Sequence, residues 1–262
     1  MIFQSDMHIH TTISNCCKDK EQTPENVVQL LAEKGYKRIG FIDHLWDSKD
    51  VQINSYISHN AEKILKFHEF IHSRAWEIEV LVGCEADMKA PESFGITHEL
   101  KEQLDYVTIA TDHFHQKFVQ QPSEQTPRAL ARHMLEFFIS AVESKLPDIL
   151  VHPFFPYGYI DIYDQAIDCI SDAEFIDAFS LAAQNNVGIE LNFCFLGLKS
   201  GSSNFSRSTP IRFLSLAKQA GCKFTLGSDS HSLEAFKVLP KLQELAKELG
   251  ITDQNIHQLA KL

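Results

Sequence analysis

The sequence predicts an α/β fold in which a parallel sheet is covered by helices. Short β-type runs alternate with helical patterns along the 262 residues and make seven β/α repeats, an order typical of parallel sheets. Such a sheet either stays open or closes into a barrel. Neither G-x-G-x-x-G nor G-x-x-x-x-G-K-[ST], the phosphate loops of open nucleotide-binding folds, is present. No Pro/Gly-rich linker divides the chain, so we expect one domain, and its length suits an α/β barrel.

Each expected element follows from a local pattern. Runs of β-branched and aromatic residues predict the strands, which are in chain order Ile2–His10, Tyr36–Asp43, Glu77–Glu85, Tyr106–Ala110, Asp148–His152, Val187–Asn192 and Lys223–Leu226. Apolar residues at helical spacing predict the helices Pro24–Lys34, Tyr56–Ser73, Glu124–Lys145, Asp172–Asn185, Pro210–Gln219 and Leu233–Leu249. Thr23 and Pro24 begin the first helix as N-cap and first-turn proline, and Gly35 and Gly221 end the first and the fifth.

Composition excludes several classes of partner. The chain carries 24 Lys and Arg against 35 Asp and Glu, a formal net charge of −11, and no basic stripe that would neutralise nucleic-acid phosphates or anionic lipids. No run approaches the 18 apolar residues of a membrane span, and the first residues, MIFQSDMHIH, do not resemble a signal peptide. The six cysteines include no C-x-x-C pair and are expected to be reduced core thiols. We therefore expect a cytoplasmic protein with a small-molecule partner.

Histidine is unusually frequent, and its placement predicts a metal centre. Six of the thirteen histidines lie at the carboxyl ends of expected strands: His8, His10, His44, His113, His152 and His231. Glu85 ends the third expected strand and Asp229 follows the last. These ends converge on one face of a parallel barrel, where burying so many polar groups would be costly without ions to pair them. The histidines expected to lie outside this site are His59, His68, His72, His98, His133 and His257.

The motifs around these residues resemble a known family. Asp6-Met-His8-Ile-His10-Thr11-Thr12-Ile13-Ser14 is similar to the first motif of the PHP (polymerase and histidinol phosphatase) family. The similarity continues through Asp43-His44, Glu85, His113, His152, Glu190-Leu-Asn192 and Gly227-Ser-Asp229-Ser-His231. The resemblance implies that residues 1–262 form one domain, a distorted (β/α)7 TIM-like barrel. It also implies two or three divalent ions, zinc, manganese or iron, and the hydrolysis of phosphoesters.

The resemblance also implies a ligand set. One metal would take His8, His10, Glu85 and Asp229; a second would take Glu85, His113 and His152; a third would take His44 and His231. Glu85 would thus bridge two ions, and Glu85, Asp229 and His231 would serve catalysis as well as metal binding. Two bridged ions can lower the pKa of a shared water and so provide hydroxide at neutral pH for attack on phosphorus.

One position departs from the family pattern. The family usually has a His or Asp shortly after the first motif as a further ligand of the third metal, whereas this chain has Asn15-Cys16-Cys17, with Asp19 slightly beyond. We expect Cys16 to ligate that metal, because a thiolate is a good zinc ligand. The alternative is that Cys16 is an uninvolved loop thiol and that the third site is weak or empty.

Further residues are candidates for substrate contact. Arg207 follows the sixth expected strand and could clamp a phosphate through two hydrogen bonds, the alternative being a solvated loop arginine. His115 lies two residues beyond His113 and would contact substrate or be exposed. Asp6 and Asp43 would either orient imidazoles or make structural hydrogen bonds.

The expected function is hydrolysis of a small phosphomonoester, with histidinol phosphate as the leading candidate substrate, because a chain of this length has no room for polymerase modules. A phosphodiesterase or nuclease acting on short nucleic acids is the second reading. A non-catalytic metal-binding domain is the third.

Overall fold

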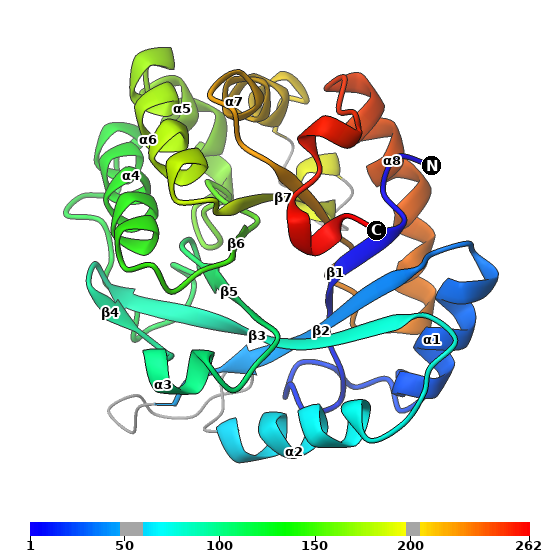
Figure 1. Cartoon of the computed structure of the whole chain (residues 1–262). Helices are drawn as coiled ribbons and strands as arrows, with labels where there is room; N and C mark the ends of the chain where they lie inside the picture. The colour runs from blue at the N-terminus through cyan, green and yellow to red at the C-terminus, as the bar shows by residue number, and fades with distance from the viewer. Residues whose placement is uncertain (48–59, 198–204) are drawn as a thin grey trace.

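The computed structural model describes residues 1–47, 60–197 and 205–262, and its strands form a nearly closed ring (Figure 1). Seven strands pair in parallel in the order β1 (Ser5–Ile9), β2 (Arg38–Leu45), β3 (Glu79–Ala90), β5 (Tyr106–Ala110), β6 (Ile149–Val151), β7 (Gly188–Asn192) and β8 (Phe224–Gly227). A parallel bridge between Ile9 and Ser230 joins the two ends of the sheet. The fold is therefore a single α/β barrel of seven strands, and the predicted fold class is confirmed.

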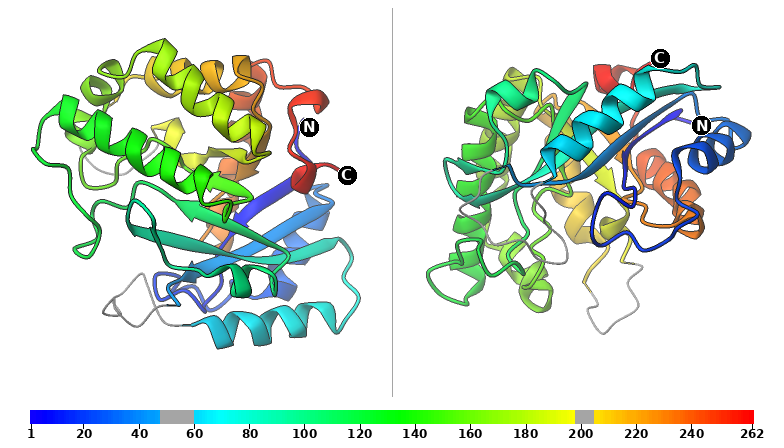
Figure 2. Two further views of the ribbon diagram at one scale, coloured as in Figure 1. Left: turned by 60° about the vertical axis from the view of Figure 1, so that its left-hand side comes forward. Right: turned by 90° about the horizontal axis from the view of Figure 1, so that it is seen from below.

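Helices surround the ring in every view (Figures 1 and 2). The α-helices are α1 (Pro24–Glu33), α2 (Ala61–His72), α3 (His98–Lys101), α4 (Pro127–Glu143), α5 (Tyr163–Asp168), α6 (Asp172–Gln184), α7 (Ser208–Gln219) and α8 (Leu239–Glu248). Short 3₁₀ turns are η1 (Ile160–Ile162), η2 (Phe193–Leu196), η3 (Leu233–Val238), η4 (Asp253–Asn255) and η5 (Gln258–Ala260). As predicted, Thr23 caps α1, where its side chain accepts a hydrogen bond from Asn26 N, and Pro24 follows it.

Tyr106 fills the amino-terminal half of the barrel. Its hydroxyl donates a hydrogen bond to Met7 O across the ring at 2.9 Å, and its ring packs against Gly40 and Gly83. A Cβ at Gly40 would lie 1.9 Å from the Tyr106 hydroxyl oxygen, so only glycine fits there. An apolar plug at this end leaves the carboxyl ends of the strands as the place for polar chemistry.

Three element predictions need correction. The predicted third strand, Glu77–Glu85, runs on to Ala90 because its end pairs antiparallel with β4 (Ser93–Phe94), so Glu85 lies inside a strand rather than at its end. The predicted last helix, Leu233–Leu249, is a 3₁₀ turn up to Val238 followed by α8, because Pro240 belongs in a first turn and not in a helix interior. The second predicted helix begins at Ala61; residues 56–59 of that prediction lie outside the described residues.

The remaining predicted boundaries lie within a few residues of the observed ones, while the short helices α3 and α5 were not predicted. None of the six cysteines forms a disulfide. None of the described helices combines the length and the apolar character that crossing a bilayer demands.

Candidate metal centre

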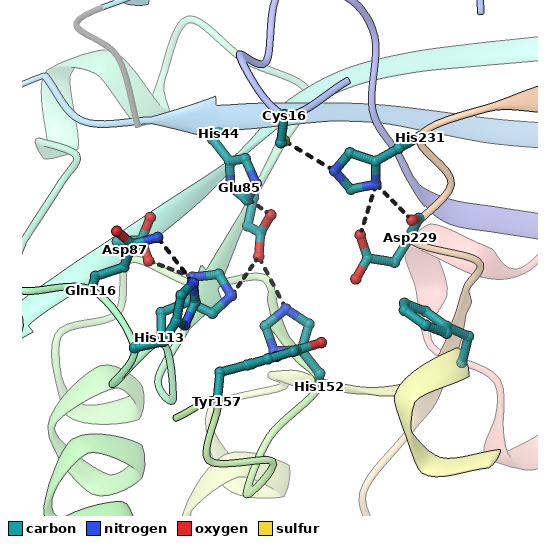
Figure 3. A pocket seen from close by; sticks show the side chains of 12 residues that line it. Cys16, His44, Glu85, Asp87, His113, Gln116, His152, Tyr157, Asp229 and His231 are labelled. Carbon is teal, nitrogen blue, oxygen red and sulfur yellow. Dashed lines mark hydrogen bonds and ion pairs between the residues drawn. The ribbon is translucent and has the colours of Figure 1, made fainter. Parts of the chain in front are cut away.

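A cavity of about 310 Å³ opens at the carboxyl ends of the strands. The side chains that line it come from segments far apart in the sequence: Cys16, His44, Glu85, Asp87, His113, His115, Gln116, His152, Tyr157, Phe193, Asp229 and His231 (Figure 3). His8 and His10 are fully buried directly behind it. The barrel thus brings together the nine residues expected to bind metal.

Glu85 is the central carboxylate, and its Oε1 faces the imidazoles of β5 and β6. This oxygen lies 3.0 Å from His152 Nε2 and 3.7 Å from His113 Nε2. The rings of His113 and His152 stack with their centroids 5.0 Å apart. One carboxylate oxygen and two imidazole nitrogens therefore face a common point.

Glu85 Oε2 faces a different group of imidazoles. It lies 3.4 Å from His10 Nε2, 3.6 Å from His8 Nε2 and 2.9 Å from His44 Nδ1. Among the described residues neither Glu85 Oε2 nor His44 Nδ1 finds a hydrogen-bond partner, although both atoms are buried. Two buried polar atoms without hydrogen-bond partners in one site indicate that a further group belongs beside them.

Asp229 completes this second group from the far side of the barrel. Its Oδ1 lies 3.2 Å from His10 Nε2 and 3.5 Å from His8 Nε2. Its backbone has φ of 52°, and that of His152 has φ of 33°, a region that side chains other than glycine seldom adopt. Backbone strain of this kind gathers at functional sites.

Three of the imidazoles are oriented by buried carboxylates. His8 Nδ1 lies 2.7 Å from Glu190 Oε1, His113 Nδ1 lies 2.6 Å from Asp87 Oδ1, and His152 Nδ1 lies 3.0 Å from Asp112 Oδ1. Each pair holds the Nδ1 atom of its imidazole against a carboxylate oxygen, so that Nε2 is turned inwards, towards the centre of the site. Carboxylate–imidazole pairs of this kind are the usual outer support of metal-binding histidines.

Two of these supports, Asp87 and Asp112, were not predicted as site residues. Asp87 lies two residues after Glu85 on β3 and so shares its face, a signal that was available in the sequence. Asp112 precedes His113, yet it pairs with His152 from the next strand, a contact that no local pattern predicts.

The pKa values of His8 and His10 are shifted in opposite directions. Burial disfavours the charged form of His8, but the Glu190 and Asp229 carboxylates outweigh it and raise its pKa. Burial and the neighbouring His231 lower the pKa of His10. The two Nε2 atoms lie only 3.0 Å apart. One of the pair is therefore neutral and offers a lone pair, as a metal ligand must.

The carboxylates of Glu85 and Asp229 both have lowered pKa values. Burial alone would raise the pKa of Glu85, but His44 and the hydrogen bond from His152 hold it well below its ordinary value. The pKa of Asp229 is likewise lowered, since His8 and His10 outweigh the burial of its carboxyl. For His152 the Asp112 carboxylate outweighs burial and raises the pKa to about 10.

Cys16 contacts the third group of imidazoles. Ligating atoms of His10, His44 and His231 lie within 4.8 Å of one another, and Cys16 Sγ is 3.0 Å from His231 Nε2. Burial disfavours the thiolate, but hydrogen bonds with His231 and His44 lower the Cys16 pKa to about 7. Cys17 turns away, donates to His231 O at 3.3 Å, and has its pKa raised by burial to about 12. Cys16 therefore lies beside His231, and its role as a metal ligand stays a prediction.

The spacing of the donor atoms fits metal ions. Ligand atoms that share a tetrahedral zinc ion at about 2.1 Å lie about 3.4 Å from one another. Glu85 Oε2 lies 3.6 Å from His8 Nε2 and 3.4 Å from His10 Nε2, and Asp229 Oδ1 lies 3.2 Å from His10 Nε2. Imidazole with carboxylate, and thiolate in addition, favours zinc or iron over magnesium or calcium.

The carboxylates of Asp6 and Asp43 accept hydrogen bonds from backbone N–H groups rather than from imidazoles. Asp43 accepts hydrogen bonds from the backbone N of Thr11 and Ser14 and from the Thr11 hydroxyl, at 2.6–3.1 Å. Asp6 accepts from the backbone N of His8 and Ser228. The structural alternative expected for both residues is therefore the one observed, and it fixes the loop that carries Cys16.

The two predicted substrate-contacting residues differ in position. His115 lines the cavity, where its ring lies beside Tyr157 with the centroids 5.6 Å apart. Arg207 does not line the cavity. Its guanidinium forms an ion pair with Glu248 at 2.7 Å and donates to Phe195 O, so it is engaged elsewhere.

Known proteins match this chain over most of its length. The PHP domain family model matches residues 6–249. A protein named "Probable phosphatase" from Shewanella loihica is 29% identical over 98% of this chain and 89% of its own length. One of the same name from Shewanella piezotolerans is 27% identical over 88% and 79%.

Two solved structures share the fold. Histidinol phosphate phosphatase from Lactococcus lactis, complexed with zinc, L-histidinol and phosphate, gives a TM-score of 0.56 at 17% identity and 94% coverage of each chain. A candidate histidinol phosphatase from Listeria monocytogenes gives 0.63 at 14% identity, covering 88% of this chain and 96% of that one. With its family model matched from Asp6 to Leu249 and its metal-type side chains gathered at one end of the barrel, the chain belongs to the PHP domain family.

Proposed function

We propose that the protein is a metal-dependent phosphomonoesterase. The observation that carries the proposal is the Glu85 carboxylate, which lies between two groups of imidazoles, with Oε1 towards His113 and His152 and Oε2 towards His8 and His10. A carboxylate so placed suits a bridge between two cations.

The ligand assignment follows the three groups. We propose His8, His10, Glu85 and Asp229 for one ion, Glu85, His113 and His152 for a second, and His44, His231 and Cys16 for a third. When bound there, zinc, manganese or iron would lower the pKa of a shared water and offset negative charge on a phosphoryl group.

The lining of the cavity supports a role for cations in binding phosphate. Among its described lining residues there is no lysine or arginine, and Arg207 is held by Glu248. A phosphate dianion beside the ionised Glu85 and Asp229 would be repelled without added positive charge. Substrate binding is therefore expected to require metal.

The other residues of the chain position and enclose the substrate. Glu190, Asp87 and Asp112 keep three imidazoles turned inwards. Tyr157 covers His113 and His152 with ring centroids 5.4 and 5.3 Å away, which limits the access of water to that side of the site. Asp229 and His231 line the cavity, so a phosphoryl group seated there would contact both, and we propose them with Glu85 as catalytic residues.

The size of the cavity supports a small substrate, and the two Shewanella relatives carry the name "Probable phosphatase". Because the Lactococcus lactis protein binds L-histidinol and phosphate, histidinol phosphate is the first substrate to test. His115 and Gln116 at the mouth are placed to contact the organic part of such a substrate.

The test compares an aryl phosphomonoester with the corresponding diester, using protein reconstituted separately with zinc, manganese and iron. We expect turnover of the monoester to exceed that of the diester. Preference for the diester would favour a phosphodiesterase, and no turnover of either, or of histidinol phosphate and nucleotides, by fully metallated protein would favour a binding module.

Glu85→Gln provides the matched variant. It removes the charge shared by two cations, and we expect turnover to fall by several orders of magnitude, the scale of a multi-kcal/mol electrostatic effect. Glu79→Gln is the control, because Glu79 begins the same strand but makes an exposed pair with Arg38.

A further inference from the structure

A second cluster of metal-type side chains lies away from the Glu85 centre. Helix α2 contains the segment His68-Glu69-Phe70-Ile71-His72, with two histidines one turn apart. Residues four apart on a helix face the same side, and this spacing is the one by which a helix presents two imidazoles to a single zinc ion. The two rings lie side by side with centroids 4.3 Å apart.

Asp105 supplies a carboxylate to both imidazoles. His68 Nε2 lies 3.2 Å from its Oδ1, and His72 Nε2 lies 2.9 Å from its Oδ2. Asp105 is itself fixed, because Val82 N donates to its Oδ2 at 2.7 Å. Among the residues that the structure describes, the ion partners of Asp105 are these two imidazoles.

The cluster borders an open hollow. A surface hollow of about 480 Å³ is lined by His68 and Asp105 together with Glu69 and Glu102. The side chains of His68, His72 and Asp105 are 25%, 43% and 21% exposed, so an ion could enter from solvent. Water or a second carboxylate could occupy the remaining coordination positions there.

The cluster is separate from the Glu85 centre. Asp105 immediately precedes β5, whereas His113 follows it, so the two lie at opposite ends of the strand. Five residues at about 3.3 Å each separate them by about 16 Å. No ligand is shared between the two groups of side chains.

We propose that His68, His72 and Asp105 form a second metal site, which takes zinc or a neighbouring first-row divalent ion. The three donor atoms lie within 4.8 Å of one another, and two imidazoles with one carboxylate favour zinc, copper or nickel over magnesium and calcium. The bound ion ties α2 to the segment before β5 and to β3, against which α2 packs. It therefore stabilises the outer layer of the barrel beside the strand that carries Glu85.

The experiment starts from metal-free protein, to which zinc is added only up to the number of equivalents that the His68→Gln/His72→Gln variant retains after dialysis, so that the Glu85 centre is filled and the proposed site is left for nickel. Nickel is then titrated by calorimetry, and thermal unfolding is followed with and without it. We expect one further equivalent to bind and the midpoint of unfolding to rise by several degrees, since a ligand of the folded state stabilises it by mass action. Absence of this extra equivalent from the parent protein would overturn the proposal.

His68→Gln/His72→Gln is the test variant and His98→Gln the control, because His98 is an exposed histidine on α3 outside the cluster. We expect the double variant to lose the extra equivalent and the nickel-dependent rise, and the control to keep both. His72→Gln alone should weaken nickel binding. Because His72 is exposed, this single variant is expected to fold and so tests the proposal even if the double variant does not fold. Binding that persists in the double variant would contradict the proposal. Unchanged phosphatase turnover in it keeps this result separate from the function of the Glu85 centre.

Discussion

Glu190 Oε1 lies 2.7 Å from His8 Nδ1, although the two residues are 182 positions apart in the sequence. The other oxygen of Glu190 accepts hydrogen bonds from His152 N and Asn192 Nδ2. One carboxylate from β7 thus fixes the direction of an imidazole on β1 and the backbone after β6.

Glu190→Gln should weaken metal binding without unfolding the barrel. The amide can still accept hydrogen bonds, but it no longer holds the His8 ring as a carboxylate does. Loss of such an outer support costs about 10- to 100-fold in metal affinity. Competition with a metal chelator of known affinity measures this change, and an affinity equal to that of the parent protein would mean that Glu190 is a structural residue only.

Gly227→Ala should disrupt the contact between Glu190 and His8 by steric overlap. A Cβ at Gly227 would lie 1.7 Å from Glu190 Oε1 and 2.8 Å from His8 Cβ, so Glu190 has to move. We expect lower metal content and lower turnover. Gly221→Ala is the control, because an added Cβ would meet no atom of the described residues within 4 Å, while the φ of 92° strains any side chain. It should lower the unfolding temperature and leave the metal content intact.

Cys16→Ser should lower zinc occupancy beside His44 and His231 while leaving the Glu85-bridged pair largely filled. A serine hydroxyl stays protonated near neutral pH and is a poorer zinc ligand than a thiolate. Cys17→Ser should do little, because Cys17 Sγ donates to His231 O and does not face the cluster. Zinc stoichiometry of both variants measures this difference. Equal occupancy in Cys16→Ser and the parent protein would make Cys16 a bystander.

The metal-free protein should show one unusually reactive thiol. The Cys16 pKa of about 7 lies below the ordinary 9.0, so the thiolate forms as the pH rises through about 7 and is lost again below it. Alkylation of Cys16 by iodoacetamide, mapped by mass spectrometry, should therefore rise with a midpoint near pH 7 and be slowed by added zinc. Cys17, with a pKa of about 12, should stay unmodified over the same range. A Cys16 midpoint near 9 would show that His44 and His231 do not stabilise the thiolate.

Much of the barrel could be predicted because its elements are marked locally. Tyr106–Ala110 was predicted with its observed bounds, since a short run of β-branched and aromatic residues has no helical spacing. The extension of β3 to Ala90 depends on pairing with Ser93–Phe94, which is a tertiary contact. Pro240 was a local signal for the start of α8 that the apolar spacing around it obscured.

The gathering of the candidate ligands at one end of the barrel could be predicted because parallel strands bring their carboxyl ends together whatever lies between them. The contacts of the residues around them could not all be predicted. Asp112 reaches past its neighbour His113 to His152, and Arg207 is drawn to Glu248 at the end of α8. Both contacts depend on where loops and helix ends lie in the folded chain, and no local sequence pattern predicts either of them.

The central claim is that Glu85 bridges two metal ions, and anomalous diffraction from crystals of metal-reconstituted protein, measured at the metal absorption edge, tests it most directly. His68→Gln/His72→Gln protein keeps the proposed second site from contributing. We predict at least two anomalous peaks flanking the Glu85 carboxylate, one among His8, His10 and Asp229 and one beside His113 and His152. A single peak beside Glu85, or none after full reconstitution, would contradict the account.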